Sequence, residues 1–366
     1  MTWTAADHQY MSRALQLARR GLYTTHPNPR VGCVLVKDDR IVAEGWHEYA
    51  GGPHAEVNAL HNARVDTAGA SCYVTLEPCC HSGRTPPCTD ALIKAGIKKT
   101  IIAMLDPNPD VAGQGRAKLE QAGIEVELGL LATTAARINR GYITRRTAGR
   151  PLVRCKLAVS LDGRTALADG TSKWITGPEA RLDVQRLRAE SSAVMTGIGT
   201  VLADDPSLNV RDIQLERQPL RVIIDPDMKF PASAKMLGLP GRTLIFSKNH
   251  DQSLHESLER SGAEIVQIGG EQTGFLQQVL SYLAGREEVN EVLLETGATL
   301  AGSMLGAGLI DELIVYQSPL LLGDGARGMF HLPAISTMAD RIELEITDTR
   351  RVGKDVRITA KVTSNK

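Results

Sequence analysis

The order of apolar and polar positions divides the chain into two stretches in which helix and strand patterns alternate. In the first stretch, short apolar runs at 31–37 and 41–46 flank a polar turn at 37–40, which predicts a β-hairpin. The residues at 54–63 have a helical pattern that opens just after Pro53. The other predicted elements here are strands at 72–76 and 99–104 and helices at 88–95, 114–122 and 132–140.

A polar segment at 145–151 separates the two stretches. It ends in the turn formers Gly149 and Pro151, so we place a domain boundary there, with domains at 1–147 and 148–366. Because strands alternate with helices on both sides of this boundary, each half is expected to be an α/β sheet. After the boundary we predict strands at 152–159, 193–196, 220–224, 243–246, 291–295 and 313–317, helices at 178–190, 274–284 and 299–305, and two strands within 343–362.

Composition and charge narrow the function classes. The chain has 366 residues, of which 42% are apolar and 23% charged, as expected for two globular domains. Its 42 basic residues balance its 42 acidic residues, which argues against a nucleic-acid partner. No apolar run has the length of a membrane span, and the first 20 residues do not resemble a signal peptide. We therefore expect a cytoplasmic protein without a membrane partner. We also expect a homo-oligomer.

The cysteines indicate metal chemistry, because three of the six lie between 79 and 88. Together with His54, the cysteines Cys79 and Cys88 provide three nitrogen and sulfur ligands, the number that a catalytic zinc site uses. Glu56 follows His54 by two residues on the same predicted helix. It is placed to accept a proton from zinc-bound water and to pass it to a leaving amine. Cys80 is adjacent to Cys79 and points elsewhere, so we exclude it as a ligand.

These residues match the H-x-E and P-C-…-C signature of zinc deaminases, with one difference in spacing. Eight residues separate Cys79 from Cys88, whereas the usual loop has two. Structural zinc sites normally use four protein ligands, and the pairing of a carboxylate with a single His favours catalysis over that alternative. Two further alternatives are a deaminase of RNA or DNA bases and a non-catalytic, zinc-stabilised binding protein.

Residues near this motif are candidates for substrate contacts. Asn28 precedes the first strand, where its side chain could read a base edge. His47 and His81 either bind substrate or are surface histidines, and we favour the surface interpretation. Arg84 and Thr85 lie between the two cysteine ligands, within reach of a phosphate group.

Several motifs together resemble the family of bifunctional riboflavin-biosynthesis deaminase/reductases. In the first half they are HPNP at 26–29, PHAE at 53–56, YVTLEPC at 73–79, GRTPPC at 83–88 and DPNP at 106–109. In the second half they are KLAVSLDGR at 156–164, WIT at 174–176, TVLADDP at 200–206 and ETGATL at 295–300. The long cysteine spacing is itself a feature of that family, and the motifs occur in its order.

The resemblance implies a cytidine-deaminase-like three-layer domain followed by an α/β domain similar to dihydrofolate reductase. It implies zinc-dependent deamination of 2,5-diamino-6-(5-phosphoribosylamino)pyrimidin-4-one. NADPH then reduces the ribosyl group of 5-amino-6-(5-phosphoribosylamino)uracil to ribityl. The expected cofactors are Zn²⁺ and NADPH, and the expected partners are small phosphorylated pyrimidines.

The residues of the second half do not define a dinucleotide site by themselves. The glycine-containing turns at 197–202 and 297–303 follow strands but lack the full dinucleotide fingerprint, and tight strand-to-helix turns need glycine for other reasons. Arg188 and Arg211 would suit phosphate, although a surface ion pair is an alternative, and Asp162 and Glu295 are candidate proton donors. The resemblance assigns NADPH contacts to Ala158, Trp174, Thr200, Asp204, Gly297, Ala298, Thr299, Leu300, Ala301, Gly302 and Ser303, and substrate contacts to Ser172, Arg188, Leu208, Arg211 and Glu295.

Overall fold

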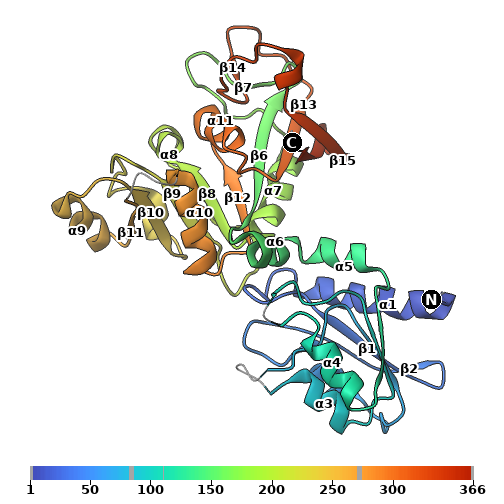
Figure 1. Cartoon of the computed structure of the whole chain (residues 1–366). Helices are drawn as coiled ribbons and strands as arrows, with labels where there is room; N and C mark the ends of the chain where they lie inside the picture. Colours follow the sequence, from blue (N-terminus) through green and yellow to red (C-terminus); the bar gives the residue numbers. More distant parts are fainter. Residues whose placement is uncertain (1–2, 82–85, 110, 270–273, 364–366) are drawn as a thin grey trace. The chain divides into compact units, whose positions relative to one another are not determined.

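The computed structural model describes residues 3–81, 86–109, 111–269 and 274–363. Contacts between residues divide the chain into two compact units, Met1–Arg150 and Pro151–Lys366 (Figure 1). Most of the polar segment at 145–151, where we placed the domain boundary, is helical, because α6 runs from Arg140 to Ala148 and ends at Gly149, whose φ is +65°. The helix buries only Gly141, Tyr142 and Arg145, so its apolar signal is weak.

Unit 1 is built on a five-stranded sheet with the order β2-β1-β3-β4-β5. β1 pairs antiparallel with β2, which confirms the predicted hairpin, and with β3, whereas β3, β4 and β5 are parallel. The strands are β1 (Gly32–Lys37), β2 (Arg40–Trp46), β3 (Ser71–Val74), β4 (Lys99–Ile102) and β5 (Glu125–Leu128).

Helices cover both faces of this sheet. Alternate residues of β1 point to opposite faces, so Val34 packs with one group of helices and Leu35 with the other. The first group is α1 (Ala5–Ala18), extended by the short helix η1 (Arg19–Gly21), and α5 (Ala132–Ile138). The second group is α2 (Ala55–Asn62), α3 (Cys88–Lys94) and α4 (Gln114–Gln121). Unit 1 therefore has the expected three layers.

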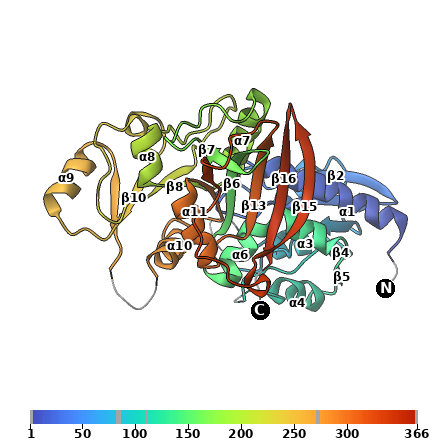
Figure 2. The same cartoon turned by 90° about the horizontal axis from the view of Figure 1, so that it is seen from above.

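Unit 2 contains a nine-stranded sheet with the order β11-β10-β9-β8-β12-β6-β13-β16-β15. The strands from β11 to β13 are parallel, and β16 and β15 continue the sheet antiparallel, side by side in Figure 2. The strands are β6 (Leu152–Ser160), β8 (Ala193–Gly197), β9 (Leu220–Ile224), β10 (Thr243–Ser247), β11 (Glu264–Gln267), β12 (Glu291–Glu295), β13 (Glu312–Ser318), β15 (Glu343–Val352) and β16 (Asp355–Thr363), with β7 (Arg164–Ala166) and β14 (Arg327–Gly328) as a separate pair.

The core of unit 2 lies on both faces of the sheet, as expected for an α/β domain. Val153, Cys155 and Leu157 of β6 belong to one apolar cluster. Leu187 of α7 belongs to a second, separate apolar cluster of the same unit. The helices are α7 (Pro178–Glu190), α8 (Ile198–Asp204), α9 (Gln252–Arg260), α10 (Phe275–Gly285) and α11 (Ala298–Gly306), with short helices η2 (Lys235–Gly238) and η3 (Met338–Asp340).

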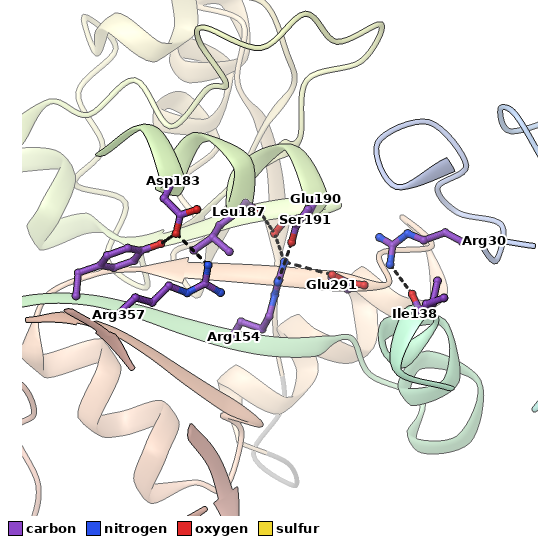
Figure 3. A network of polar contacts seen from close by, with 10 residues as sticks. Arg30, Ile138, Arg154, Asp183, Leu187, Glu190, Ser191, Glu291 and Arg357 are labelled. Atoms are coloured by element: carbon purple, nitrogen blue, oxygen red, sulfur yellow. Dashed lines mark hydrogen bonds and ion pairs between the residues drawn. The ribbon is translucent and has the colours of Figure 1, made fainter. Parts of the chain in front are cut away.

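Two polar clusters attach α7 to the sheet (Figure 3). At the end of the helix, the Arg154 guanidinium lies 3.3 Å from the carboxylates of both Glu190 and Glu291. Two turns earlier, Asp183 accepts a hydrogen bond of 2.9 Å from Arg357 of β16. These charged groups are mostly buried and fix the position of α7 along the strands.

Candidate active sites

Three side chains of unit 1 form a metal-binding geometry. His54 is the N-cap of α2, Cys79 follows β3, and Cys88 is the first residue of α3. Their ligand atoms all lie within 4.8 Å of one another, with His54 Nδ1 at 3.2 Å from Cys88 Sγ and at 3.5 Å from Cys79 Sγ. A tetrahedral zinc with its usual bond lengths separates a nitrogen and a sulfur ligand by about 3.5 Å. The three residues therefore fit a zinc ion.

The surroundings of Cys79 favour its thiolate form. Cys79 Sγ accepts hydrogen bonds from the Cys88 thiol, from His54 and from the backbone N–H of Cys88, whose nitrogen is 3.3 Å away. These hydrogen bonds lower the pKa of Cys79 well below its ordinary value. The thiolate is the form of cysteine that binds metals. Cys80 is not part of the cluster, and its Sγ instead lies 3.8 Å from Gln114 Oε1.

Glu56 lies in the first turn of α2, two residues from His54, with only 3% of its surface exposed. Burial raises the pKa of Glu56 to about 6, and the nearby Cys79 adds to this effect while His54 opposes it. A carboxyl group that titrates near neutral pH can both accept and release a proton during turnover.

A buried histidine lies next to the three candidate zinc ligands. The rings of His47 and His54 are 5.4 Å apart, and His47 is 3% exposed, so the expectation of a surface histidine is wrong at this position. Its Nδ1 is 3.0 Å from the carbonyl oxygen of Pro53, and its Nε2 is 3.0 Å from Nδ2 of Asn28. Burial lowers the pKa of His47, which favours a neutral ring that donates to Pro53 and accepts from Asn28.

The remaining candidates of unit 1 are less informative. His81 is exposed, as a surface histidine would be. Arg84 and Thr85 lie outside the described residues.

In unit 2 the candidate cofactor residues gather where the parallel strands end. Ala158 is on β6, Thr200 and Asp204 are on α8 directly after β8, and Gly297 caps α11 directly after β12. Ligands of open parallel sheets bind at this edge. A Cβ added at Gly297 would meet no atom within 4 Å, so there is open space beside the N-cap of α11. This arrangement fits the phosphates of a dinucleotide.

The predicted NADPH residues on α11 do not all face this space. Ala301 and Gly302 are buried, and a Cβ at Gly302 would lie 2.1 Å from the carbonyl oxygen of His331. Gly297, Thr299 and Ser303 are exposed, while Ala298 and Leu300 are half-buried.

Trp174 is 70% exposed, with the guanidinium of Arg181 4.6 Å from its ring centre. Asp204 lies 3.4 Å from the ammonium of Lys173, so this predicted NADPH residue has a cationic partner.

Two predicted substrate residues bind each other. The Arg188 guanidinium contacts both carboxylate oxygens of Glu295, at 2.5 and 2.9 Å, and its third nitrogen donates to the carbonyl oxygen of Asn209. The fork that we expected to bind phosphate is therefore occupied by Glu295. Arg211 is exposed, whereas Leu208 is 2% exposed and belongs to the core. Ser172 is half-buried.

Neither candidate proton donor is suited to that role. Hydrogen bonds from Ser160 and from the backbone of Gly323 and Leu322 lower the pKa of Asp162 to about 2, so this carboxylate instead holds a loop in place. Burial disfavours the charge on Glu295, but the Arg188 guanidinium outweighs burial and lowers the pKa of Glu295.

Lys156 is a residue whose role we did not predict. It is half-buried on β6, directly across the parallel pairing from Glu295. Burial lowers the pKa of Lys156, although Glu295 opposes this effect. The signal in the sequence that could have singled it out is a lysine in the middle of a mostly apolar strand, LVRCKLAVS.

Comparison with known proteins agrees with both halves of this description. Residues 4–104 match the family described as the cytidine and deoxycytidylate deaminase zinc-binding region, and residues 151–358 match the RibD C-terminal domain. The riboflavin biosynthesis protein RibD of Escherichia coli (strain K12) is 47% identical, over 96% of this chain and 98% of that protein.

Solved structures show the same relationship. Acinetobacter baumannii RibD, form 1, is 46% identical with a TM-score of 0.91, and the similarity covers 98% of this chain and 99% of that one. The Thermotoga maritima diaminohydroxyphosphoribosylaminopyrimidine deaminase/5-amino-6-(5-phosphoribosylamino)uracil reductase is 34% identical with a TM-score of 0.86, over 98% and 99% of the two chains. The chain therefore belongs to the RibD family of bifunctional riboflavin-biosynthesis enzymes, in which a zinc-dependent deaminase and an NADPH-dependent reductase share one polypeptide.

Proposed function

We propose that unit 1 deaminates the aminopyrimidine substrate at a site where His54, Cys79 and Cys88 hold zinc. The observation that carries this proposal is the convergence of these three ligand atoms beside a buried carboxylate. When bound in such a site, zinc lowers the pKa of a water molecule and supplies a nucleophile at neutral pH. Three protein ligands leave the fourth position open for that water.

Glu56 moves the proton in this proposal. Its carboxylate takes a proton from the attacking water and then delivers it to the leaving amine, for which a pKa near 6 is well suited. Asn28 and His47 form a neutral, hydrogen-bonded pair beside the metal ligands, and we propose that they orient the pyrimidine ring.

For the reductase reaction we propose that NADPH lies along the carboxyl edge of the unit 2 sheet. Its phosphates would be held by the start of α11, with Thr299 and Ser303 on the exposed side of that helix. Ala158, Trp174, Thr200 and Asp204 are the further contacts that we propose for the cofactor. Hydride transfer then requires mainly that the nicotinamide and the sugar be placed together without water.

The charged residues beside this edge are proposed to hold the sugar phosphate. Arg211 is exposed and its backbone N–H is fixed by Gln185 at 2.9 Å, so it is our candidate for binding the phosphate. Arg188 keeps Glu295 charged and oriented toward the sugar hydroxyls. Lys156, whose pKa is lowered, is our candidate for supplying the proton at the reduced carbon's oxygen.

The residue roles in unit 1 can be tested with three variants of the full chain. Glu56→Gln is expected to keep zinc and to lose ammonia release by a factor of at least about 10². Cys88→Ser is expected to lose zinc, whereas Cys80→Ser, the matched control, should keep both zinc and activity. Metal content per chain and ammonia release are the measurements. A Glu56→Gln enzyme with wild-type ammonia release would remove the assignment of Glu56.

We also propose that the protein forms a homodimer through β15, the outermost strand of the unit 2 sheet. Its side chains are exposed along most of its length, including Leu344 at 46% and Ile346 at 65%. An exposed strand edge with apolar side chains is normally covered by a partner. Sedimentation should give a dimer that Ile346→Lys dissociates, and a monomeric wild-type protein would contradict the proposal.

The cellular environment and other partners are also proposals. In the part of the chain that the structure describes, no helix is long and apolar enough to cross a membrane. A site that uses two thiolates needs reduced cysteines, which supports a cytoplasmic location. We propose small phosphorylated pyrimidines, rather than nucleic acid, as the partners of both sites.

A further inference from the structure

Glu77 carries a buried carboxylate close to the proposed zinc ligands. It is 6% exposed and lies two residues before the zinc ligand Cys79. Its Oε2 accepts hydrogen bonds from the backbone N–H groups of Asp106, at 3.1 Å, and Gly113, at 2.9 Å. Its Oε1 accepts a third from the backbone N–H of Arg116, at 2.9 Å. One side chain thus binds three backbone donors that lie 29 to 39 residues further along the chain.

Two of these donors, Gly113 and Arg116, belong to the start of α4, which has no side-chain cap of its own. The N-cap residue is Gly113, with a φ of +80° and no side chain to accept a hydrogen bond from the first turn. Arg116 is the third residue of the helix, the position whose N–H a capping side chain normally binds. Glu77 supplies this cap from a distant part of the sequence, and its negative charge also suits the positive end of the helix.

The same helix end packs directly against the segment that carries the metal ligand. A Cβ added at Gly115 would lie 2.0 Å from the carbonyl oxygen of Pro78 and 3.2 Å from Glu77 Oε1. Only glycine allows this approach, and Pro78 is the residue between Glu77 and Cys79. The start of α4 and the segment 77–79 therefore form one tightly packed unit.

Cys79 is held from its other side by α3. Its carbonyl oxygen accepts a hydrogen bond of 3.1 Å from the backbone N–H of Thr89, and its Sγ accepts one from the backbone N–H of Cys88. The position of the Cys79 thiolate therefore depends on α3 on one side and on Glu77 with α4 on the other.

We propose that Glu77 is a positioning residue of the deaminase site. By binding the backbone of Asp106, Gly113 and Arg116, it fixes the segment that carries Cys79 against α4 and so holds one zinc ligand in its place. The inference rests on the proposed role of Cys79 as a metal ligand. Residues that orient metal ligands from outside the coordination shell typically change metal affinity by 10- to 100-fold when they are replaced.

Glu77→Gln is the most informative variant, because it keeps the shape of the side chain. A carboxamide has one acceptor oxygen, so its NH₂ group must face either Arg116 N–H or the other two donors. We expect zinc to dissociate at least about tenfold faster from this variant, and kcat for ammonia release to fall by a similar factor. Gly115→Ala disturbs the same contact from the side of the helix and should change both quantities in the same direction.

Glu44→Gln is the matched control. Glu44 also uses both carboxylate oxygens, each 2.7 Å from a nitrogen of Arg13, but it lies on β2 and contacts α1. This variant should keep the wild-type zinc dissociation rate. The reductase activity of the same polypeptide reports on whether unit 2 remains intact, and it should be unchanged in all three variants.

Zinc dissociation is measured on the full-length holoenzyme by transfer to a chromophoric chelator, and ammonia release is measured separately. Faster zinc loss in Glu77→Gln and Gly115→Ala, but not in Glu44→Gln, supports the proposal. If Glu77→Gln lowers only the melting temperature of unit 1, with zinc loss and kcat at wild-type values, Glu77 serves stability alone and the inference is overturned. If the wild-type protein itself neither holds zinc nor releases ammonia, the proposed function fails and this inference fails with it.

Discussion

Asp183→Asn should strongly destabilise unit 2, because Asp183 connects α7 to two strands. Its Oδ2 accepts hydrogen bonds from the Tyr316 hydroxyl, at 2.6 Å, and from Arg357, at 2.9 Å. The Asp183 and Arg357 side chains are only 13% and 10% exposed, so solvent screens this pair weakly. Burial, together with the hydrogen bond to Asp183, raises the pKa of Tyr316, which keeps the hydroxyl protonated as a donor.

The size of the effect follows from these contacts. An asparagine can keep both hydrogen bonds through its single oxygen, but the bond from Tyr316 loses its charge-assisted character and the buried Arg357 charge is left without a counter-charge on Asp183. Removing one charge of a buried ion pair costs about 3–5 kcal/mol, and because asparagine keeps the hydrogen bonds we expect the lower end, a loss of about 3 kcal/mol. For a unit of this size, that loss lowers the melting temperature by about 6–12 °C.

Differential scanning calorimetry of the full chain measures this shift. NADPH raises the melting temperature of the unit that binds it, which identifies the transition of unit 2. The matched control is Arg186→Ala, because Arg186 is 58% exposed and lies 3.9 Å from the other carboxylate oxygen of Asp183. An exposed ion pair at this distance contributes less than about 1 kcal/mol to stability. If Asp183→Asn and Arg186→Ala shift the unit 2 transition equally, the reasoning from burial is refuted.

Three further substitutions test other parts of the account. Gly45→Ala would place a Cβ 2.3 Å from the backbone nitrogen of Ala59, so it should displace α2 and lower the free energy of unfolding of unit 1 by about 2–3 kcal/mol. Ammonia release should fall while NADPH oxidation is unchanged, and equal loss of both activities would contradict this. Gly302→Ala should displace α11 and weaken NADPH binding, measured by fluorescence titration, with the zinc content as the unaffected control. Arg211→Ala should raise the KM of the reductase for its phosphorylated substrate by about tenfold or more with a smaller change in kcat, and an unchanged KM would remove Arg211 from the phosphate site.

The elements that could be predicted from the sequence are those with strong local signals. Strands β9 and β12 and helix α7 were predicted at their observed bounds, because buried parallel strands are apolar runs and α7 opens with a proline. The short strands β5 and β11 were missed, because half of their residues are charged or polar and none is more than half-buried. Residues 145–148 of α6 were placed in the polar boundary segment, because the only one of them that is buried is an arginine.

In the candidate site, too, the residues that could be predicted are those with a strong local signal in the sequence. His54, Glu56, Cys79 and Cys88 could be identified because the zinc motif is local and chemically specific. The pairing of Arg188 with Glu295 joins residues 107 positions apart and could not be inferred from either neighbourhood. Likewise, nothing near Glu77 in the sequence indicates that its partners lie at the start of α4.

We conclude that one polypeptide carries out two consecutive reactions, one in each unit. The most direct test supplies the purified protein with the diaminopyrimidinone ribosyl phosphate and NADPH and records ammonia release and NADPH oxidation together. We expect ammonia to appear first and NADPH to be consumed afterwards. A chelator should abolish ammonia release, while NADPH oxidation persists when the deaminated aminouracil is supplied directly. Ammonia release without NADPH oxidation, or NADPH oxidation that the chelator abolishes even with the aminouracil supplied, would contradict the account.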